Sequence, residues 1–222
     1  MGEILFNCKF SLNDQNTPVD PNDEEIVESE SSPKNQFFMP EPKTVVESIE
    51  NRIYFYSTVD EMSALKLNKE LRLLSNSIIA RSIIHESTPL NLFLHINSYG
   101  GALFESLSVM DEILKINKRV PITTIVDGKC ASGSTLIAMA GKIRLMKKNS
   151  YMMIHQLRGG SVGTYNNMKD SNSNADKIHL KLIDLYCQFT KLTKRSLIKL
   201  LEHDLYMDSK EALSYGFIDA II

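Results

Sequence analysis

The sequence is poor in cysteine, has no long apolar run and carries almost no net charge. Its three cysteines are far apart and odd in number, so they form neither a metal-ligand spacing nor a disulfide framework, and we expect a reducing compartment. No apolar run is long enough to span a membrane, and no basic segment followed by an apolar stretch predicts a secretory signal. The net charge is −2 and the Lys and Arg residues are scattered, so the sequence predicts no positive surface that would attract nucleic acid or an anionic membrane.

The first 40 or so residues differ from the rest of the chain. Residues 13–33 are polar, acidic and punctuated by proline, and such a segment cannot bury enough apolar surface to offset the entropy of ordering it. We therefore predict a flexible N-terminal arm at residues 1–40 and one folded domain at residues 41–222. A hydrophobic fraction of 43% over the chain can supply the core of that domain.

Apolar patterning predicts strands that alternate with helices along the folded domain. A short helix is expected at residues 44–51, and a longer helix begins near Asp60 with one apolar face: Leu65, Leu67, Leu71, Leu74, Ile78 and Ile79. Apolar and β-branched runs predict strands at residues 52–57, 90–96, 121–126, 142–146, 151–154 and 217–222. Further helices are expected at residues 102–117, from 135, and at 164–189, 196–201 and 209–215.

This alternation favours an α/β domain with largely parallel strand pairing. In such folds the active site gathers at the carboxyl ends of the strands. Four polar features lie at or near predicted strand ends: the Gly100-Gly101 turn, Ser132, His155 and Asp204. We expect them to lie close together.

Ser132 lies at a predicted strand-to-helix junction. There its hydroxyl meets the positive end of a helix, and the next backbone N–H can point at an oxyanion. A serine nucleophile needs a base and an orienting acid; His155 ends a strand, whereas His95 lies inside an apolar run and suits a packed role. On residues alone, Ser132 also fits a helix N-cap and Asp204 a surface acid.

Four sequence blocks resemble the ATP-dependent Clp protease proteolytic subunit (ClpP) family. They are residues 94–101 (LHINSYGG), 128–134 (GKCASGS), 153–160 (MIHQLRGG) and 204–219 (DLYMDSKEALSYGFID). They follow the family's order and spacing and cover about residues 44–222. Each block alone is weak evidence for the family, but together the blocks contain a serine, a histidine and an aspartate in the family's order.

The resemblance implies a serine endopeptidase with Ser132 as nucleophile, His155 as general base and Asp204 as the orienting acid. It also implies an oxyanion hole made by the backbone N–H groups of Gly101 and Gly133. The residue types agree with this reading, since glycine at 101 permits close approach of a substrate and Gly133 supplies the donor directly after the nucleophile.

The resemblance further implies how substrate and partners are handled. Gly100, Gly159 and Gly160 would offer backbone to an extended peptide, which would add as a strand. The family fold is ClpP/crotonase-like, with repeated ββα units, a protruding long helix and a short α/β handle. The resemblance implies that the subunits form two stacked seven-membered rings and that this chain needs no cofactor. It also implies a Clp-type AAA+ unfoldase as partner, which uses the ATP, and unfolded proteins as substrates. A location in the cytoplasm, a plastid stroma or a phage-infected host is implied as well, with the arm serving as pro-segment or pore lining.

The chain departs from the family pattern at several positions. Tyr99 and Leu157 stand where the family has proline, so both turns lose a fixed φ. Gly133 replaces a methionine, and Ser134 stands at a glycine position as a rival hydroxyl.

Two other functions fit parts of the sequence. One is a crotonase-type acyl-CoA enzyme, which shares the fold but has no need of Ser132, His155 and Asp204 together. The other is a catalytically impaired ring subunit that only builds the barrel.

Overall fold

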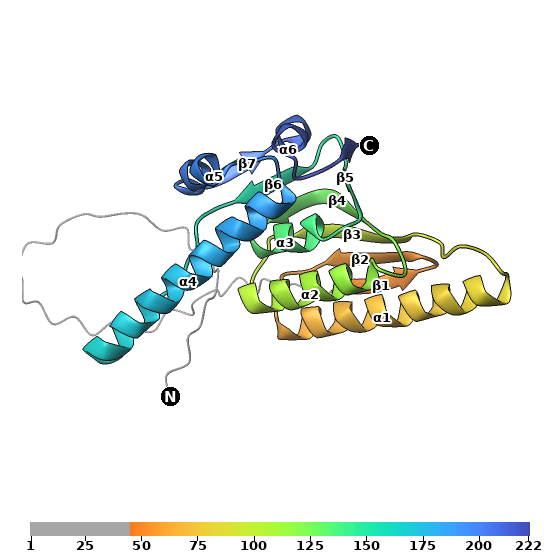
Figure 1. Ribbon diagram of the computed structural model, residues 1–222, viewed down its shortest axis with the longest axis horizontal. Helices are drawn as coiled ribbons and strands as arrows, with labels where there is room; N and C mark the ends of the chain where they lie inside the picture. The colour runs from red at the N-terminus through yellow and green to blue at the C-terminus, as the bar shows by residue number, and fades with distance from the viewer. Residues whose placement is uncertain (1–44) are drawn as a thin grey trace, which may run out of the picture. The chain divides into compact units, whose positions relative to one another are not determined.

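The computed structural model describes residues 45–222, so the predicted arm at residues 1–40 lies outside the described residues. In chain order the elements are β1 Val45–Ile49, β2 Arg52–Tyr56, α1 Glu61–Ile84, β3 Leu92–Ser98, α2 Leu103–Ile116, β4 Ile122–Ala131, α3 Gly133–Met139, β5 Ile143–Met146, β6 Tyr151–Ile154, α4 Tyr165–Phe189, α5 Lys194–Leu201, β7 Leu205–Met207, α6 Ser209–Tyr215 and β8 Ala220–Ile221. Figure 1 shows the strands stacked in one layer, with α1 and α2 running side by side along it. The predicted α/β alternation is confirmed.

The described strands form one sheet with a branch at β4. Along its main path the order is β1-β2-β3-β4-β5-β8, while β6 pairs with β4 and with β7. Only β1–β2 and β6–β7 are antiparallel among these pairs, as the prediction of largely parallel pairing requires. The branch arises because the first half of β4 pairs with β5 and its last three residues pair with β6. Strand β4 therefore continues to Ala131, beyond the predicted end at residue 126.

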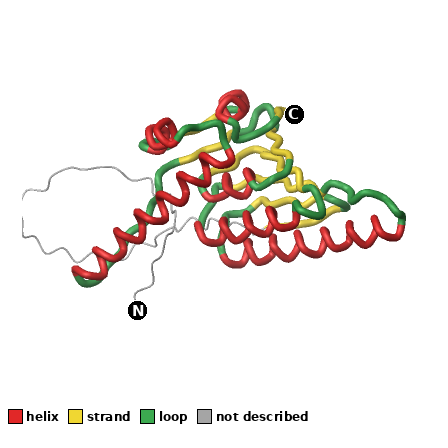
Figure 2. Tube along the Cα trace, in the orientation of Figure 1, coloured by secondary structure: helices red, strands yellow, loops and turns green. Residues whose placement is uncertain are grey.

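The core lies between the sheet and the helices that cover it. Figure 2 shows these helices alongside the strands. Helix α1 contributes Leu67, Leu71 and Ile78, all buried, to this core. Its first turn is closed by a capping box in which Asp60 and Ser63 each accept the other's backbone N–H. Leu65 was expected on the buried face but is exposed, because the helix turns it away from the sheet.

Two other predictions of secondary structure are wrong, and one strand was missed. Residues 44–51 were expected to form a helix, but Val45–Ile49 is strand β1, which pairs with β2 across a tight turn. The C-terminal strand, expected at residues 217–222, is limited to Ala220–Ile221. The three-residue strand β7 was not predicted, because its partner β6 lies far away in the sequence and propensity describes only the local chain.

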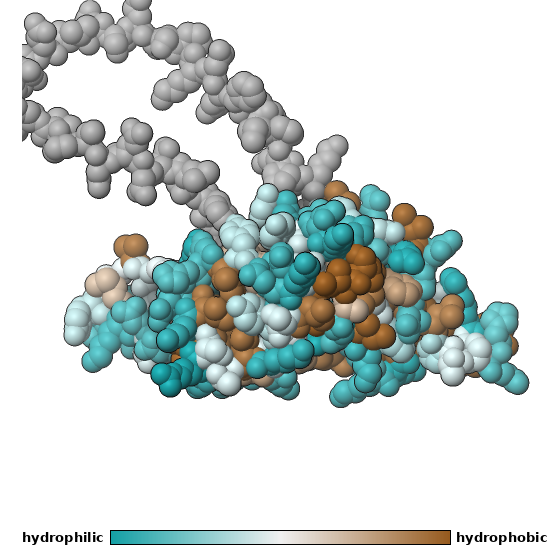
Figure 3. All heavy atoms as spheres, turned by 90° about the horizontal axis from the view of Figure 1, so that it is seen from above, coloured by the Kyte–Doolittle hydropathy of each residue, from teal (hydrophilic) through white to brown (hydrophobic). Residues whose placement is uncertain are grey.

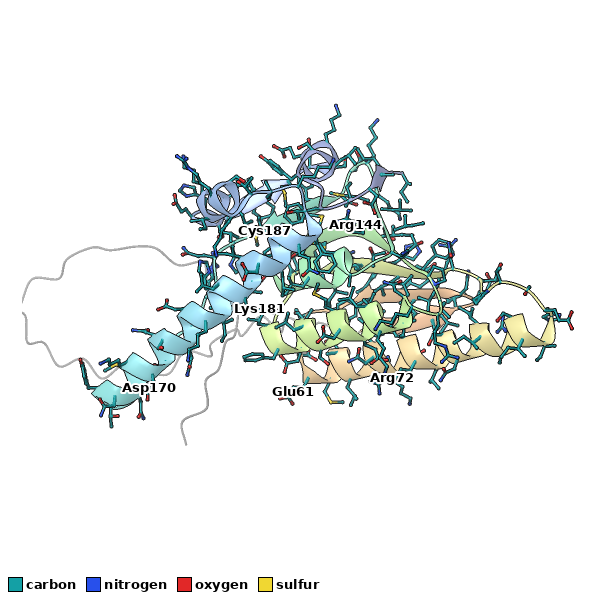
Figure 4. All side chains as sticks on the ribbon, in the orientation of Figure 1. Glu61, Arg72, Arg144, Asp170, Lys181 and Cys187 are labelled. Atoms are coloured by element: carbon teal, nitrogen blue, oxygen red, sulfur yellow. The ribbon has the colours of Figure 1, made fainter. Side chains whose placement is uncertain are left out.

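The predicted long helix at residues 164–189 is present as α4. Its outer part extends away from the sheet, with Asp170 near one end and Lys181 near the middle (Figure 4). Its C-terminal end is anchored by Arg144 of β5, which donates to the carbonyls of Phe189 and Gly216. Burial raises the pKa of the Asp219 carboxyl, but hydrogen bonds from Arg144 outweigh burial and lower it overall.

A polar cluster ties together strands β2, β3 and β4. The Asp127 carboxylate accepts from the Tyr56 hydroxyl at 2.7 Å, contacts His95 Nδ1 at 3.3 Å and is bound by Lys147. Tyr54 stacks on the His95 ring at 4.7 Å between centroids. Burial opposes ionisation of Asp127, yet the hydrogen bonds from Lys147 and Tyr56 outweigh it and lower its pKa. The expectation that His95 is a packed strand histidine is confirmed.

Asp127→Asn is expected to lower the free energy of unfolding at pH 7 by about 1–3 kcal/mol, because it removes the charge that Lys147 and His95 face. A carboxyl whose pKa is lowered by folding stabilises the protein above its unfolded pKa and loses that contribution as the pH falls through its folded pKa. The difference between wild type and variant should therefore shrink below about pH 4. Urea denaturation at several pH values measures it. Asp111→Asn, a change of an exposed carboxylate on α2, is the control, and an equal loss in both variants would contradict the role of the cluster.

Candidate active site

Ser132 lies between strand β4 and helix α3. Its φ of 54° and ψ of −128° are unusual for a residue with a side chain and cost about 1–3 kcal/mol. The conformation is held by a hydrogen bond of 2.8 Å from the Ser132 N–H to the carbonyl of Met153. The predicted strand-to-helix junction is confirmed, and the sharp turn sets the hydroxyl at the edge of the sheet.

His155 follows the last residue of β6. Because β4 and β6 are parallel and Ala131 lies opposite Met153, the residues just after these strands lie side by side. His155 Nε2 is 3.0 Å from Ser132 Oγ. Its Nδ1 lies 2.5 Å from the Gln156 carbonyl oxygen, which can only accept a hydrogen bond. Nδ1 therefore carries the hydrogen and Nε2 accepts from the serine, which is the tautomer that a general base needs.

Asp204 reaches the same edge by a different route. It precedes β7, and the antiparallel pairing of β7 with β6 puts Leu205 opposite Ile154. Both carboxylate oxygens of Asp204 accept from Arg158 Nη2, at 2.6 and 2.7 Å. The structure thus brings Ser132 and His155 together and pairs Asp204 with Arg158.

The two glycines expected to donate to an oxyanion flank Ser132. Gly101 has a φ of 150°, and a Cβ there would lie 2.1 Å from the Val59 carbonyl oxygen. Val59 holds this segment by donating to the Gly100 carbonyl and accepting from the Ala102 N–H, each at 2.8 Å. Gly133 begins α3, and a Cβ there would lie 2.3 Å from Ser106 Oγ. No other residue type fits either position without movement of its neighbours.

Ser134, the rival hydroxyl, is fully buried. It donates to the Ala131 carbonyl at 2.7 Å and lies 3.3 Å from the Ser98 carbonyl. Its place inside α3 turns it away from His155. Ser134 therefore acts in packing, and Ser132 is the serine beside the imidazole.

A pocket opens beside Ser132 and is lined by apolar side chains of α2, α3 and α4. Its walls include Leu103, Leu136, Leu182 and Tyr186, together with His155, Leu157 and Arg158. The Tyr186 hydroxyl lies 2.7 Å from Thr135 Oγ1, which itself donates to the Ser132 carbonyl at 2.6 Å. Burial raises the pKa of Tyr186 to about 12, so the hydroxyl keeps its proton and donates to Thr135.

Two of these residues were missed by sequence reasoning. Arg158 follows His155 by three positions within the third sequence block. A charged residue there, directly before two glycines, could have indicated a side chain at the site. Tyr186 follows Ile183 by three positions, and with Ser171 these are the buried residues of α4. Leu182 and Tyr186, one helical turn apart, are the residues of α4 that line the pocket.

The glycine-rich segments predicted to bind a peptide differ in exposure. Gly100 is buried in the turn after β3, whereas Gly159 and Gly160 are exposed between β6 and α4. Tyr99 replaces a proline in the first turn, and Lys129 Nζ lies 3.5 Å from its ring centroid. This cation–π contact restrains a turn that lacks the proline ring.

Within residues 45–222, no group of three or more His, Cys, Asp or Glu side chains is placed to hold a metal ion. No helix of that part is both long and apolar enough to cross a membrane.

Comparison with known proteins gives a consistent result. Residues 43–222 match the model of the Clp protease family. The ATP-dependent Clp protease proteolytic subunit of Deinococcus radiodurans is 33% identical over 67% of this chain and 74% of its own length. That of Streptococcus mutans is 34% identical over 67% of this chain and 78% of its own.

A solved structure supports the fold. A ClpP1 mutant from Listeria monocytogenes matches with a TM-score of 0.66 and 20% identity, covering 78% of this chain and 91% of that one. The predicted ClpP-like fold is confirmed, and nothing in the matches supports an acyl-CoA enzyme. The chain therefore belongs to the Clp protease family and is a serine-type peptidase subunit.

Proposed function

We propose that this subunit cleaves unfolded polypeptides into short peptides with Ser132 as nucleophile, His155 as general base and Asp204 as the orienting acid. The observation that carries the proposal is the 3.0 Å contact between Ser132 Oγ and His155 Nε2, at a strained junction and with the correct tautomer. Asp204 is included because it lies at the same sheet edge and in the family's sequence position.

The reaction proceeds through an acyl-enzyme. His155 Nε2 takes the hydroxyl proton as Ser132 Oγ attacks the peptide carbonyl, and the resulting oxyanion accepts from the N–H groups of Gly101 and Gly133. The imidazolium then gives its proton to the leaving amine as the C–N bond breaks. Water, deprotonated by His155, hydrolyses the ester and restores the serine. No cofactor takes part in these steps.

Substrate recognition depends mainly on backbone. The segments at Gly100-Gly101 and Gly159-Gly160 flank the serine and would pair with an extended peptide, adding it as a strand. The apolar pocket formed by Leu103, Leu136 and Leu182 would take an apolar side chain next to the cleaved bond. Pairing through backbone explains how one site could accept many sequences.

We further propose that the subunit works in two stacked seven-membered rings, served by a Clp-type AAA+ unfoldase that uses ATP, in the cytoplasm or a plastid stroma. Large apolar side chains are exposed on α1 and α4, among them Met62, Leu65, Tyr165 and Leu180. Figure 3 shows apolar side chains exposed among polar ones on the face that it draws. Surface of this kind suits contacts between subunits.

A fluorophosphonate probe tests the function directly, since it phosphonylates an activated serine. We expect the purified wild-type protein to be labelled at Ser132, Ser134→Ala to be labelled equally, and His155→Gln to lose labelling by about 100-fold or more because the base is gone. Mass spectrometry of the labelled peptide identifies the site. A folded wild-type protein that takes no label would instead support the structural ring subunit.

A further inference from the structure

Arg158 and Asp204 form an ion pair at the rim of the proposed active site. Arg158 lies between β6 and α4 and lines the pocket that contains Ser132 and His155. Its Nη2 donates to both oxygens of Asp204, at 2.6 and 2.7 Å. The two side chains are 44% and 40% exposed, so water and salt reach the pair.

The ion pair holds the Asp204 carboxylate at Arg158, whereas the proposed reaction needs that carboxylate at Nδ1 of His155. In the present arrangement Nδ1 of His155 is held by the Gln156 carbonyl. A carbonyl fixes the tautomer of the imidazole, but it has no net charge with which to stabilise the imidazolium that forms during attack. A carboxylate does both. Asp204 on Nδ1 would add a negative charge to a site in which Ser132 and His155 already have the required geometry.

The ion pair is weak enough for Asp204 to leave Arg158 and bind His155 instead. An exposed ion pair contributes little, and dissolved salt screens it further. One guanidinium nitrogen bridges both oxygens, so the second terminal nitrogen of the fork makes no bond to the carboxylate. The backbone pairing of β6 with β7 already holds Asp204 near the chain at His155.

We propose that Arg158 is a positioning residue that withholds Asp204 from His155, so that full activity requires the Arg158–Asp204 pair to open. This inference rests on the proposed function of Ser132 and His155. It also predicts regulation of the site, since anything that draws Arg158 away, such as an anionic group of a substrate or partner, releases the carboxylate.

Arg158→Gln tests the proposal. We expect kcat/KM for a short peptide to rise about threefold to tenfold, the amount that an exposed ion pair can withhold. The remote control Arg81→Gln, which removes an exposed guanidinium from α1, should stay near wild type. Added salt should activate wild type but not Arg158→Gln.

The pH profile separates positioning from packing. With Asp204 on His155 the imidazolium is stabilised, so the acidic limb of kcat/KM should move to higher pH in Arg158→Gln. The other ionisable groups nearby are Tyr186 in the pocket and Glu202 and His203 before Asp204. These groups are present in both wild type and Arg158→Gln, so their effect on the pH profile is the same in both proteins.

Asp204→Asn completes a double-mutant cycle. We expect it to lower activity alone and to remove all activation by Arg158→Gln. Activation by Arg158→Gln that persists in the Asp204→Asn background, or a fall in activity in Arg158→Gln alone, would overturn the proposal. If Ser132 still takes the fluorophosphonate in those cases, the proposed function stands without the switch; if wild type takes none, the proposed function itself fails.

Discussion

Ser132→Ala is expected to lower kcat/KM for peptide cleavage by about 10⁴-fold or more, because it removes the hydroxyl that lies 3.0 Å from His155 Nε2. The fold should survive, since the Ser132 side chain makes no N-cap hydrogen bond to α3. Steady-state hydrolysis of a fluorogenic peptide measures the loss, and circular dichroism checks the fold.

The matched control is Ser108→Ala, which removes a hydroxyl from the exposed face of α2 and should keep wild-type activity. Hydrolysis by Ser132→Ala at a rate close to wild type would mean that the reaction uses another nucleophile. Ser134 could not take over, because it is buried and its hydroxyl donates to backbone carbonyls at the ends of β4 and β3.

Gly133→Ala is expected to have the second largest effect. The new Cβ would lie 2.3 Å from Ser106 Oγ, so either the Ser106 hydroxyl must leave its hydrogen bond with the Ala102 carbonyl or the start of α3 must shift. We expect the free energy of unfolding to fall by about 1–3 kcal/mol. We also expect kcat to fall about 100-fold, because the N–H that would face the oxyanion moves with the backbone. Urea denaturation and steady-state kinetics measure the two losses.

Ser106→Ala should rescue much of this loss. It removes the hydroxyl at 2.3 Å and leaves Ser106 Cβ at 3.2 Å, which small adjustments can accommodate. Alone, it loses only the hydrogen bond of 2.8 Å to the Ala102 carbonyl. The double variant should therefore be more stable than Gly133→Ala by at least about 1 kcal/mol. Equal destabilisation by Gly133→Ala in both backgrounds would show that the contact with Ser106 is not the cause. Glycine at 133 thus leaves room for the hydroxyl of Ser106.

The sequence was most informative where structure depends on neighbouring residues. The helical spacing of Leu67, Leu71 and Ile78 predicted the buried side of α1, and its start was predicted near Asp60, which is its N-cap. The run before Ser132 predicted a strand and the residues after it a helix, so the junction followed. The order of the four blocks then identified the family from the chain alone.

The sequence was least informative for short strands. Strand β1 was predicted as a helix, although its partner β2 follows directly across a tight turn and its two valines favour a strand. Strand β7 was missed because its partner β6 lies far away in the sequence, and this antiparallel pairing is what brings Asp204 to the sheet edge.

By itself, the sequence determined the class of fold, the order of its longer elements and the residue types that a serine peptidase needs. Only the tertiary structure decided which of those side chains meet: Ser132 with His155, Asp204 with Arg158, and Gly133 with Ser106. The physical reason is that periodicity and caps act over a few residues, whereas hydrogen bonds and steric contacts act between atoms a few ångströms apart, whatever their separation along the chain.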